Sequence, residues 1–233
     1  ELKKNNEFIE INKNTEIKFI LAGHQIDNSN TKIKKIIKDN NLEDITQLVG
    51  DYSEDRVDNF YDLIDVHVLS SRSEGFPNVV AESMRYGVPN ISTKVGDADR
   101  IIGETGWIVE PRSKSALAKA FLEALKLHKK DKSKWQMLKI NASKRINENY
   151  NIFKMIDSFN NLWSENFQNN QVTKIFHIIS GLGSGGAQAV LARLVKNEKK
   201  YKHTIISFMD FGIYESYFRE INVKLIKLDM EKG

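Results

Sequence analysis

Residues 65–96 read "DVHVLSSRSEGFPNVVAESMRYGVPNISTKVG". The stretch starts with a short apolar run and passes through a loop that holds Gly75 and Pro77. It continues as an amphipathic segment that stops at Gly87, and it then returns to an apolar run. Short apolar runs bounded by turn residues are typical of buried strands, and an amphipathic segment closed by glycine is typical of a helix. The stretch therefore predicts a strand, a loop, a helix and a second strand.

The same alternation extends to both sides of this stretch. Because strands and helices that alternate imply right-handed crossovers, the pattern predicts an α/β fold with a Rossmann-like parallel sheet. A parallel sheet of this kind is covered by helices on both faces. The expected strands are 17–23, 45–50, 65–71, 89–96 and 105–111, and the expected helices are 31–41, 54–64, 78–87 and 113–128.

A change of pattern follows residue 128. Residues 129–171 are helical in pattern, polar and aromatic, and "QNNQ" at 168–171 looks like a linker. The sheet pattern then restarts, with strands expected at 173–180, 203–210 and 222–229 and helices at 188–200 and 213–221. We therefore predict two domains, 1–170 and 171–233. A unit of about 60 residues is marginal alone, so we expect the natural chain to continue.

Composition excludes several classes of protein. No run of about 20 apolar residues is present, so no membrane span is expected, and the absence of cysteine excludes disulfides and thiolate metal sites. The net charge of +4 falls short of a nucleic-acid footprint. The five histidines lack ligand spacing with a carboxylate, so no metal is predicted.

Glu74 and Glu82 stand on either side of the predicted helix start. If Asn78 caps that helix, the amides of Val79 and Val80 remain open and form an anion site with the helix dipole. Each carboxylate accepts two hydrogen bonds at once, which suits vicinal diols. A phosphate between two diols describes a nucleotide sugar. Two solvated carboxylates, or a glycosidase acid pair, are the alternatives that spacing alone leaves open.

Residues 65–111 also resemble the donor-binding half of family 4 retaining glycosyltransferases, which have the GT-B architecture. The resemblance runs from about residue 16 to residue 167 and rests on the Glu-x7-Glu motif and its surroundings. It implies that Glu74 binds the donor sugar and stabilises positive charge at the anomeric carbon, and that Glu82 holds the ribose hydroxyls. The implied donor-binding residues are Glu74, Gly75, Phe76, Pro77, Asn78, Val79 and Glu82, with Glu74 also catalytic.

The chain departs from that family pattern in two places. Family members carry a "GR…K" segment whose Arg and Lys neutralise the diphosphate, and nothing before residue 16 matches it. The family often has two adjacent glycines in the loop where this chain has Gly96 followed by Asp97. Either change affects the contacts expected with the donor.

A glycine loop, "GLGSGGA" at 181–187, joins a predicted strand to a predicted helix in the second part of the chain. Gly181, Gly183 and Gly186 match the G-x-G-x-x-G dinucleotide fingerprint, and Asp210 follows at the end of the next strand. On this pattern the loop binds a dinucleotide, as in an oxidoreductase. A tight turn that lets helix and strand pack closely is the structural alternative.

Residues 174–197 also resemble the start of a family 4 glycosyltransferase. By that resemblance Gly183, Gly185 and Gly186 let the backbone approach the donor phosphate or the acceptor. The donor-like half comes first in this chain, whereas the family places it second. A junction between two tandem transferases, with a linker near 168–173, is the simplest explanation, and a circular permutant is the alternative.

The resemblance therefore implies a glycosyltransferase that moves a sugar from a nucleotide-diphosphate donor to a glycan or lipid-linked acceptor, with retention, in cell-surface polysaccharide synthesis. The resemblance implies no cofactor besides the donor substrate. A non-catalytic module that binds nucleotide sugars is a further alternative. We expect a cytoplasmic location, and the basic run "KLHKKDKSKW" at 126–135 suits peripheral contact with an anionic membrane.

Overall fold

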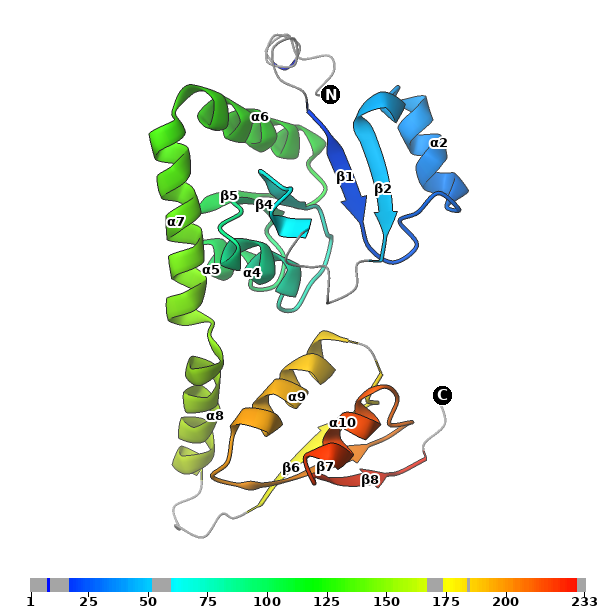
Figure 1. Ribbon diagram of the computed structural model, residues 1–233, viewed down its shortest axis with the longest axis vertical. Helices are drawn as coiled ribbons and strands as arrows, with labels where there is room; N and C mark the ends of the chain where they lie inside the picture. The colour runs from blue at the N-terminus through cyan, green and yellow to red at the C-terminus, as the bar shows by residue number, and fades with distance from the viewer. Residues whose placement is uncertain (1–7, 9–16, 52–59, 167–173, 184, 230–233) are drawn as a thin grey trace. The chain divides into compact units, whose positions relative to one another are not determined.

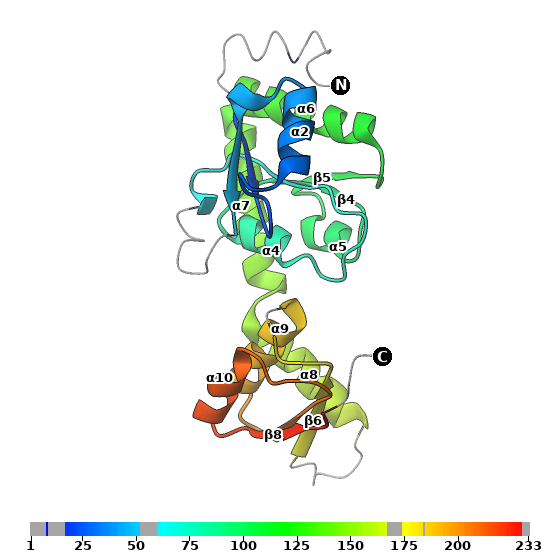
Figure 2. The same cartoon turned by 90° about the vertical axis from the view of Figure 1, so that its right-hand side faces the viewer.

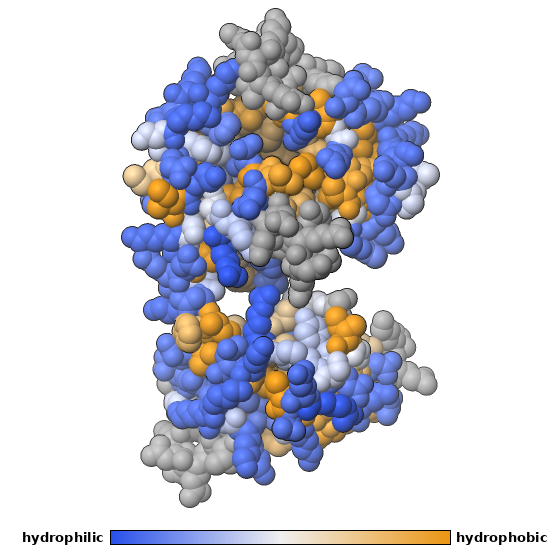
Figure 3. All heavy atoms as spheres, in the orientation of Figure 1, coloured by the Kyte–Doolittle hydropathy of each residue, from blue (hydrophilic) through white to orange (hydrophobic). Residues whose placement is uncertain are grey.

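The computed structural model describes residues 8, 17–51, 60–166, 174–183 and 185–229. These residues form two compact units, Glu1–Ile146 and Asn147–Gly233, which are described separately. Hydrophilic residues cover most of the visible surface of each unit, and smaller apolar patches are also visible on each unit (Figure 3). No helix among the described residues is long and apolar enough to cross a membrane.

The first unit begins with a parallel strand pair. Strand β1 (Phe19–Ala22) pairs in parallel with β2 (Thr46–Gly50), and α2 (Thr31–Asp39) and the 3₁₀ helix η2 (Glu43–Ile45) connect them. The side chain of Asn30 caps α2 by accepting from the amides of Lys32 and Ile33. These elements confirm the predicted strands and helix of this region, whereas most of the helix expected at 54–64 lies outside the described residues.

A second parallel sheet of the first unit has the order β3-β4-β5, and its strands β4 and β5 are labelled in Figures 1 and 2. Its strands are β3 (His67–Leu69), β4 (Asn90–Thr93) and β5 (Gly106–Val109), so the three strands expected at 65–71, 89–96 and 105–111 are confirmed. Helix α4 (Asn78–Arg85) connects β3 to β4, and α5 (Ala98–Ile102) connects β4 to β5. The sequence did not predict α5.

Apolar side chains fix α4 and α5 against this sheet. Val80 and Met84 of α4, Ile91 of β4, and Ile101 and Ile102 of α5 are all fully buried. Gly87 ends α4 with φ +71°, and its amide donates to the carbonyl of Met84. Glycine adopts this left-handed conformation without steric cost, which explains why the helix stops there.

Three long helices follow the sheet of the first unit. They are α6 (Lys114–Lys130), α7 (Lys132–Asn149) and α8 (Ile152–Asn166). Ser113 caps α6 by accepting from the amide of Ala116, and α6 packs on the sheet through Ala120 and Ala124. The helical interpretation of 129–171 is confirmed for the residues that the structure describes.

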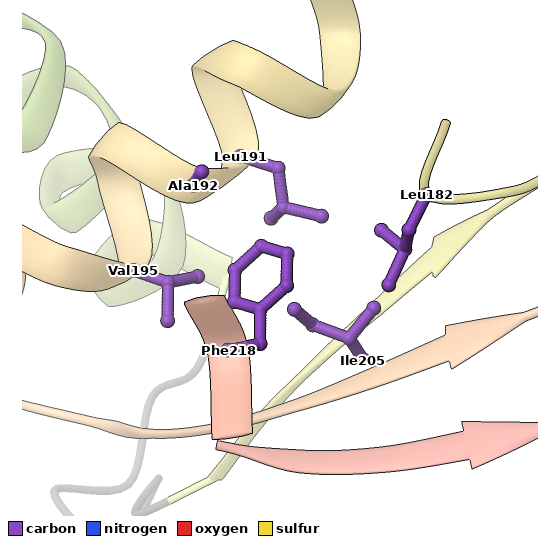
Figure 4. Close-up of a cluster of buried hydrophobic side chains, with 6 residues drawn as sticks. All are labelled: Leu182, Leu191, Ala192, Val195, Ile205 and Phe218. Atoms are coloured by element: carbon purple, nitrogen blue, oxygen red, sulfur yellow. The ribbon is translucent and has the colours of Figure 1, made fainter. Parts of the chain in front are cut away.

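The second unit contains the sheet β6-β7-β8, again parallel. The strands are β6 (Lys174–Ile179), β7 (Lys202–Ser207) and β8 (Lys224–Lys227), and the connecting helices are α9 (Gly186–Asn197) and α10 (Tyr214–Glu220). The core between helices and sheet is one apolar cluster, shown in Figure 4 and made up of Leu182, Leu191, Ala192, Val195, Ile205 and Phe218.

Helix α8 is grouped with this second unit. Trp163 of α8 packs edge-on against Tyr201, with ring centroids 5.4 Å apart, and lies 6.2 Å from His177. The sequence places the domain boundary after residue 170, on the basis of the linker-like QNNQ and the restart of the sheet pattern, and that boundary stays a prediction.

Candidate functional site

The loop between β3 and α4 carries the predicted site residues. It starts where β3 ends, at the carboxyl edge of a parallel sheet, which is where such sheets bind ligands. Thr93 lies at the end of the adjacent strand β4, and its hydroxyl donates a hydrogen bond to the carbonyl oxygen of Ser71 over 2.7 Å. Because Thr93 is buried, the sheet holds the start of the loop in place.

Glu74 lies exposed on this loop. Its Oε1 accepts a hydrogen bond from the hydroxyl of Ser71 over 2.7 Å. The carboxylate therefore has one oxygen bonded to the protein, while the side chain as a whole faces solvent. An exposed carboxylate in a defined orientation is suited to accept hydrogen bonds from a polyhydroxyl ligand.

The start of α4 differs in one respect from the prediction. Asn78 is the first helical residue, and Pro77 occupies the cap position without a side-chain hydrogen bond. The prediction that Asn78 caps the helix is wrong, because proline at the preceding position fixes the entry of the chain and leaves Asn78 in the first turn. Val80 is also not open, since its amide donates to the carbonyl of Pro77 over 3.0 Å.

The open amides of α4 are those of Asn78 and Val79. Within the part of the chain that the structure describes, neither N–H has a hydrogen-bond acceptor. The helix dipole adds positive character at the same end. The open amides therefore lie one residue earlier than the sequence predicts, and the anion site stays a prediction.

Glu82 lies half-buried in α4, one turn beyond these amides. Two tyrosines neighbour it: Tyr61 and Tyr86 stack with ring centroids 5.3 Å apart. Burial raises the pKa of Tyr61, and the negative charge of Glu82 raises it further. Sequence reasoning missed Tyr61, whose nearness to Glu82 depends on a contact across 21 positions and has no local signal.

A second loop, between β4 and α5, supports the Glu74 loop. The amide of Asp97 donates to the carbonyl oxygen of Gly75 over 2.9 Å. Gly96 has φ +51°, and a Cβ added there would overlap the Gly75 carbonyl and lie 2.6 Å from that of Glu74. Only glycine allows the two loops to approach this closely. The side chain of Asp97 pairs with Arg100 at 3.4 Å.

A buried polar cluster lies beneath the site. Asn90 Oδ1 contacts His67 Nδ1 at 2.6 Å and accepts from the Ser83 hydroxyl over 3.1 Å. Burial lowers the pKa of His67, and the Asn90 hydrogen bond opposes that shift. His67 is thus a structural residue of β3, and the cluster links β3, β4 and α4.

The glycine loop of the second unit precedes α9. Gly185 occupies the cap position and Gly186 is the first helical residue, while residue 184 lies outside the described residues. Gln188 donates from Nε2 to the carbonyl of Gly181 over 2.9 Å and closes the loop. A Cβ added at Gly183 would meet open space.

Asp210, the candidate ribose acid of the dinucleotide alternative, pairs with Lys227 at 3.0 Å. His24, at the end of β1, contacts Asp51 at 3.1 Å, and both side chains are exposed. Across the described residues, no group of three or more His, Cys, Asp or Glu side chains could hold a metal ion. The Glu74 and Glu82 loop-helix junction is therefore the best-formed candidate site of the first unit.

Comparison with known proteins gives several relatives. An uncharacterized glycosyltransferase of Methanocaldococcus jannaschii is 35% identical over 96 residues, which are 40% of this chain and 27% of that protein. The N-acetyl-alpha-D-glucosaminyl L-malate synthase of Bacillus anthracis is 25% identical over 145 residues, 61% of this chain and 36% of the relative. The chain thus spans about a third of the length of the curated relatives it matches.

Solved structures share the fold. A glycosyltransferase from Rickettsia africae aligns with a TM-score of 0.59 and 21% identity, covering 70% of this chain and 44% of that one. The Anabaena protein HepE, solved in complex with UDP-glucose, aligns with a TM-score of 0.53 and 18% identity over 64% of this chain and 41% of HepE. These structural neighbours are GT-B glycosyltransferases, which confirms the predicted fold class.

A family model described as "Glycosyl transferases group 1" matches residues 2–145, more than half of the 233 residues. The match covers β1 to β5 and includes both site glutamates. The chain therefore belongs to the group 1 glycosyl transferases.

Proposed function

We propose that the protein is a retaining glycosyltransferase whose first unit binds a nucleotide-diphosphate sugar at the junction of β3 and α4. The observation that supports this most directly is the arrangement of Glu74, the open amides of Asn78 and Val79, and Glu82 along one loop and one helix. An anion-binding helix end between two carboxylates matches the order of sugar, diphosphate and ribose in such a donor.

Each group has a defined role in this proposal. Glu82 accepts hydrogen bonds from the ribose hydroxyls. The amides of Asn78 and Val79 stabilise the diphosphate, whose negative charge grows as it leaves, and this is electrostatic catalysis by fixed dipoles. Glu74 accepts from the sugar hydroxyls and stabilises positive charge at the anomeric carbon. The backbone from Gly75 to Pro77 lines the same path, and no cofactor or metal takes part.

A uridine or guanosine diphosphate sugar is the donor class that we propose, and HepE, solved with UDP-glucose, shares this fold. The proposed acceptor is a glycan or a lipid-linked sugar of cell-surface polysaccharide synthesis. The second unit, with its Gly183, Gly185 and Gly186 loop, is proposed to be the opening part of an N-terminal-type GT-B domain, in line with its β-α-β-α-β order.

A membrane contact is the further part of this proposal. Lys129, Lys130, Lys132 and Lys134 lie exposed around the turn between α6 and α7, and Met137 and Ile140 of α7 are 56% and 51% exposed. Lysines around exposed apolar side chains suit the peripheral surface of an anionic bilayer. Such a location would bring the enzyme to a lipid-linked acceptor at the inner face of the membrane.

Ligand titration tests the donor proposal. Saturation-transfer NMR would compare UDP-glucose, GDP-mannose, NAD and FAD as ligands of the 233-residue chain. One sugar nucleotide should give a binding signal, and the two dinucleotides should give none. A binding signal from NAD or FAD alone would favour the oxidoreductase alternative. Donor binding without transfer to any acceptor, measured on a protein with both GT-B domains, would favour a non-catalytic binding module.

A further inference from the structure

We infer that Ser71 is a positioning residue that sets the orientation of the Glu74 carboxylate for the sugar part of the donor. This inference rests on the proposed function and adds a residue to it. Its physical basis is a chain of two hydrogen bonds that runs from the buried end of β4 to an exposed carboxylate.

The first link of the chain joins the loop to the sheet. Thr93 is 4% exposed and closes β4, and its hydroxyl donates to the carbonyl of Ser71 over 2.7 Å and contacts that of Leu69 at 3.5 Å. A buried β-branched residue has little rotational freedom. The backbone of Ser71 is therefore held in a fixed position relative to β3 and β4.

The second link joins Ser71 to Glu74. The Ser71 hydroxyl donates to Glu74 Oε1 over 2.7 Å, a short bond of the kind formed when the acceptor is ionised. An exposed glutamate otherwise samples several rotamers, and ordering such a side chain costs free energy when a ligand binds. With Oε1 bonded to Ser71, the carboxylate is held in one orientation before the ligand arrives, and its remaining lone pairs stay available to accept from the ligand.

The backbone on the other side of Glu74 is held independently. Asp97 donates its amide to the Gly75 carbonyl over 2.9 Å, and Gly96 packs against the carbonyls of Glu74 and Gly75. Removal of the Ser71 hydroxyl should therefore leave the loop in place and free only the side chain of Glu74. For this reason the effect should be confined to the part of the donor that Glu74 contacts.

A comparison of two ligands on matched variants tests the inference. Calorimetric titration would measure the affinity of wild type, Ser71→Ala and Ser71→Thr for UDP and UDP-glucose, or for GDP and GDP-mannose if the wild type prefers guanosine. We expect Ser71→Ala to bind the nucleoside diphosphate as tightly as wild type and the sugar nucleotide about tenfold more weakly, since a bond to a charged group is lost. Ser71→Thr, which keeps the hydroxyl, should restore most of the difference.

Ser73→Ala is the matched control, because Ser73 is an exposed serine of the same loop one residue before Glu74. It should leave both affinities unchanged. Equal affinities of wild type and Ser71→Ala for the sugar nucleotide, or an equal loss for both ligands with a lower melting temperature, would overturn the inference. A wild-type chain that binds neither ligand would instead overturn the proposed function.

Discussion

The amide of Asp97 donates to the carbonyl oxygen of Gly75 over 2.9 Å, so the loop after β4 is bonded to the loop that carries Glu74. Gly96, immediately before Asp97, lies against the same carbonyl. Two loops that follow neighbouring parallel strands thus form one structural support for the site. The family often has two adjacent glycines in this loop. This chain has only the first of them, Gly96, and that is the glycine that the contact needs.

Gly96→Ala should disrupt this support. A Cβ at residue 96 would overlap the Gly75 carbonyl, and the left-handed φ of +51° adds strain, so we expect a loss of about 1–3 kcal/mol in unfolding free energy. Sugar-nucleotide affinity should fall at least tenfold as the Glu74 loop moves. Urea unfolding and calorimetric titration would measure both. Gly183→Ala, whose Cβ meets open space, should have unchanged stability; unchanged stability of Gly96→Ala as well would contradict the loop contact.

Glu82→Gln should weaken the binding of UDP and UDP-glucose alike, because both ligands contain the ribose. Loss of the charge removes two charge-assisted acceptors for the ribose hydroxyls, and we expect about a tenfold rise in Kd. Titration of both ligands measures the effect. Glu123→Gln on α6 changes the net charge by the same amount at an exposed position and should bind as wild type does. A Glu82→Gln variant with wild-type affinity would exclude the ribose role.

The second unit should lose stability in mild acid through His177. Burial, followed by the nearby His203, lowers the pKa of His177 from 6.5 to about 4. Between about pH 6.5 and pH 4 the His177 ring is therefore protonated in the unfolded chain and neutral in the folded chain. Because the unfolded state binds more protons, the free energy of unfolding falls as the pH drops from 6.5 to about 4. His177 Nε2 lies 2.9 Å from His203 Nδ1, and Glu198 Oε2 lies 2.9 Å from His203 Nε2.

Thermal unfolding of wild type and His177→Gln at several pH values between 4 and 7 measures this dependence. As the pH falls, the melting temperature of the wild type should decrease more than that of the variant, because glutamine does not titrate. Parallel pH curves for the two proteins would show that His177 contributes nothing to acid sensitivity.

Phe218→Ala should destabilise the second unit by about 3–5 kcal/mol, as expected when a large buried ring leaves a cavity. Phe218 is fully buried among Leu191, Val195 and Ile205. Phe176→Ala is the matched control, since Phe176 of β6 is 57% exposed. Its cost should stay below about 1 kcal/mol in the same urea unfolding experiment. Similar losses for the two variants would contradict the position of the core.

Replacement of Lys129, Lys130, Lys132 and Lys134 by glutamine should reduce binding to vesicles that contain phosphatidylserine. Each lysine near an anionic surface contributes about 1 kcal/mol, so the loss should exceed tenfold. Vesicle sedimentation measures it, with phosphatidylcholine vesicles and high salt as controls in which binding should be weak. Equal binding of wild type to charged and uncharged vesicles would exclude the proposed membrane contact.

The sequence by itself determined the order of strands and helices apart from α5, the position of the Glu-x7-Glu motif at a loop-helix junction, and the helix end at Gly87. These features depend on periodicity and on single residues with restricted or permissive backbones, which act over a few positions. For the same reason the predicted elements 17–23, 31–41 and 89–96 agree with β1, α2 and β4.

Only the tertiary structure decided which groups surround the two glutamates. The bond from Thr93 to Ser71, the contact of Gly96 with Gly75 and the charge of Glu82 beside Tyr61 all join residues about 20 positions apart. Such contacts depend on how parallel strands align at their carboxyl ends, and alternation of apolar and polar residues does not specify that alignment. The cap residue also differed: the helix begins at Asn78 as expected, but Pro77 occupies the cap position.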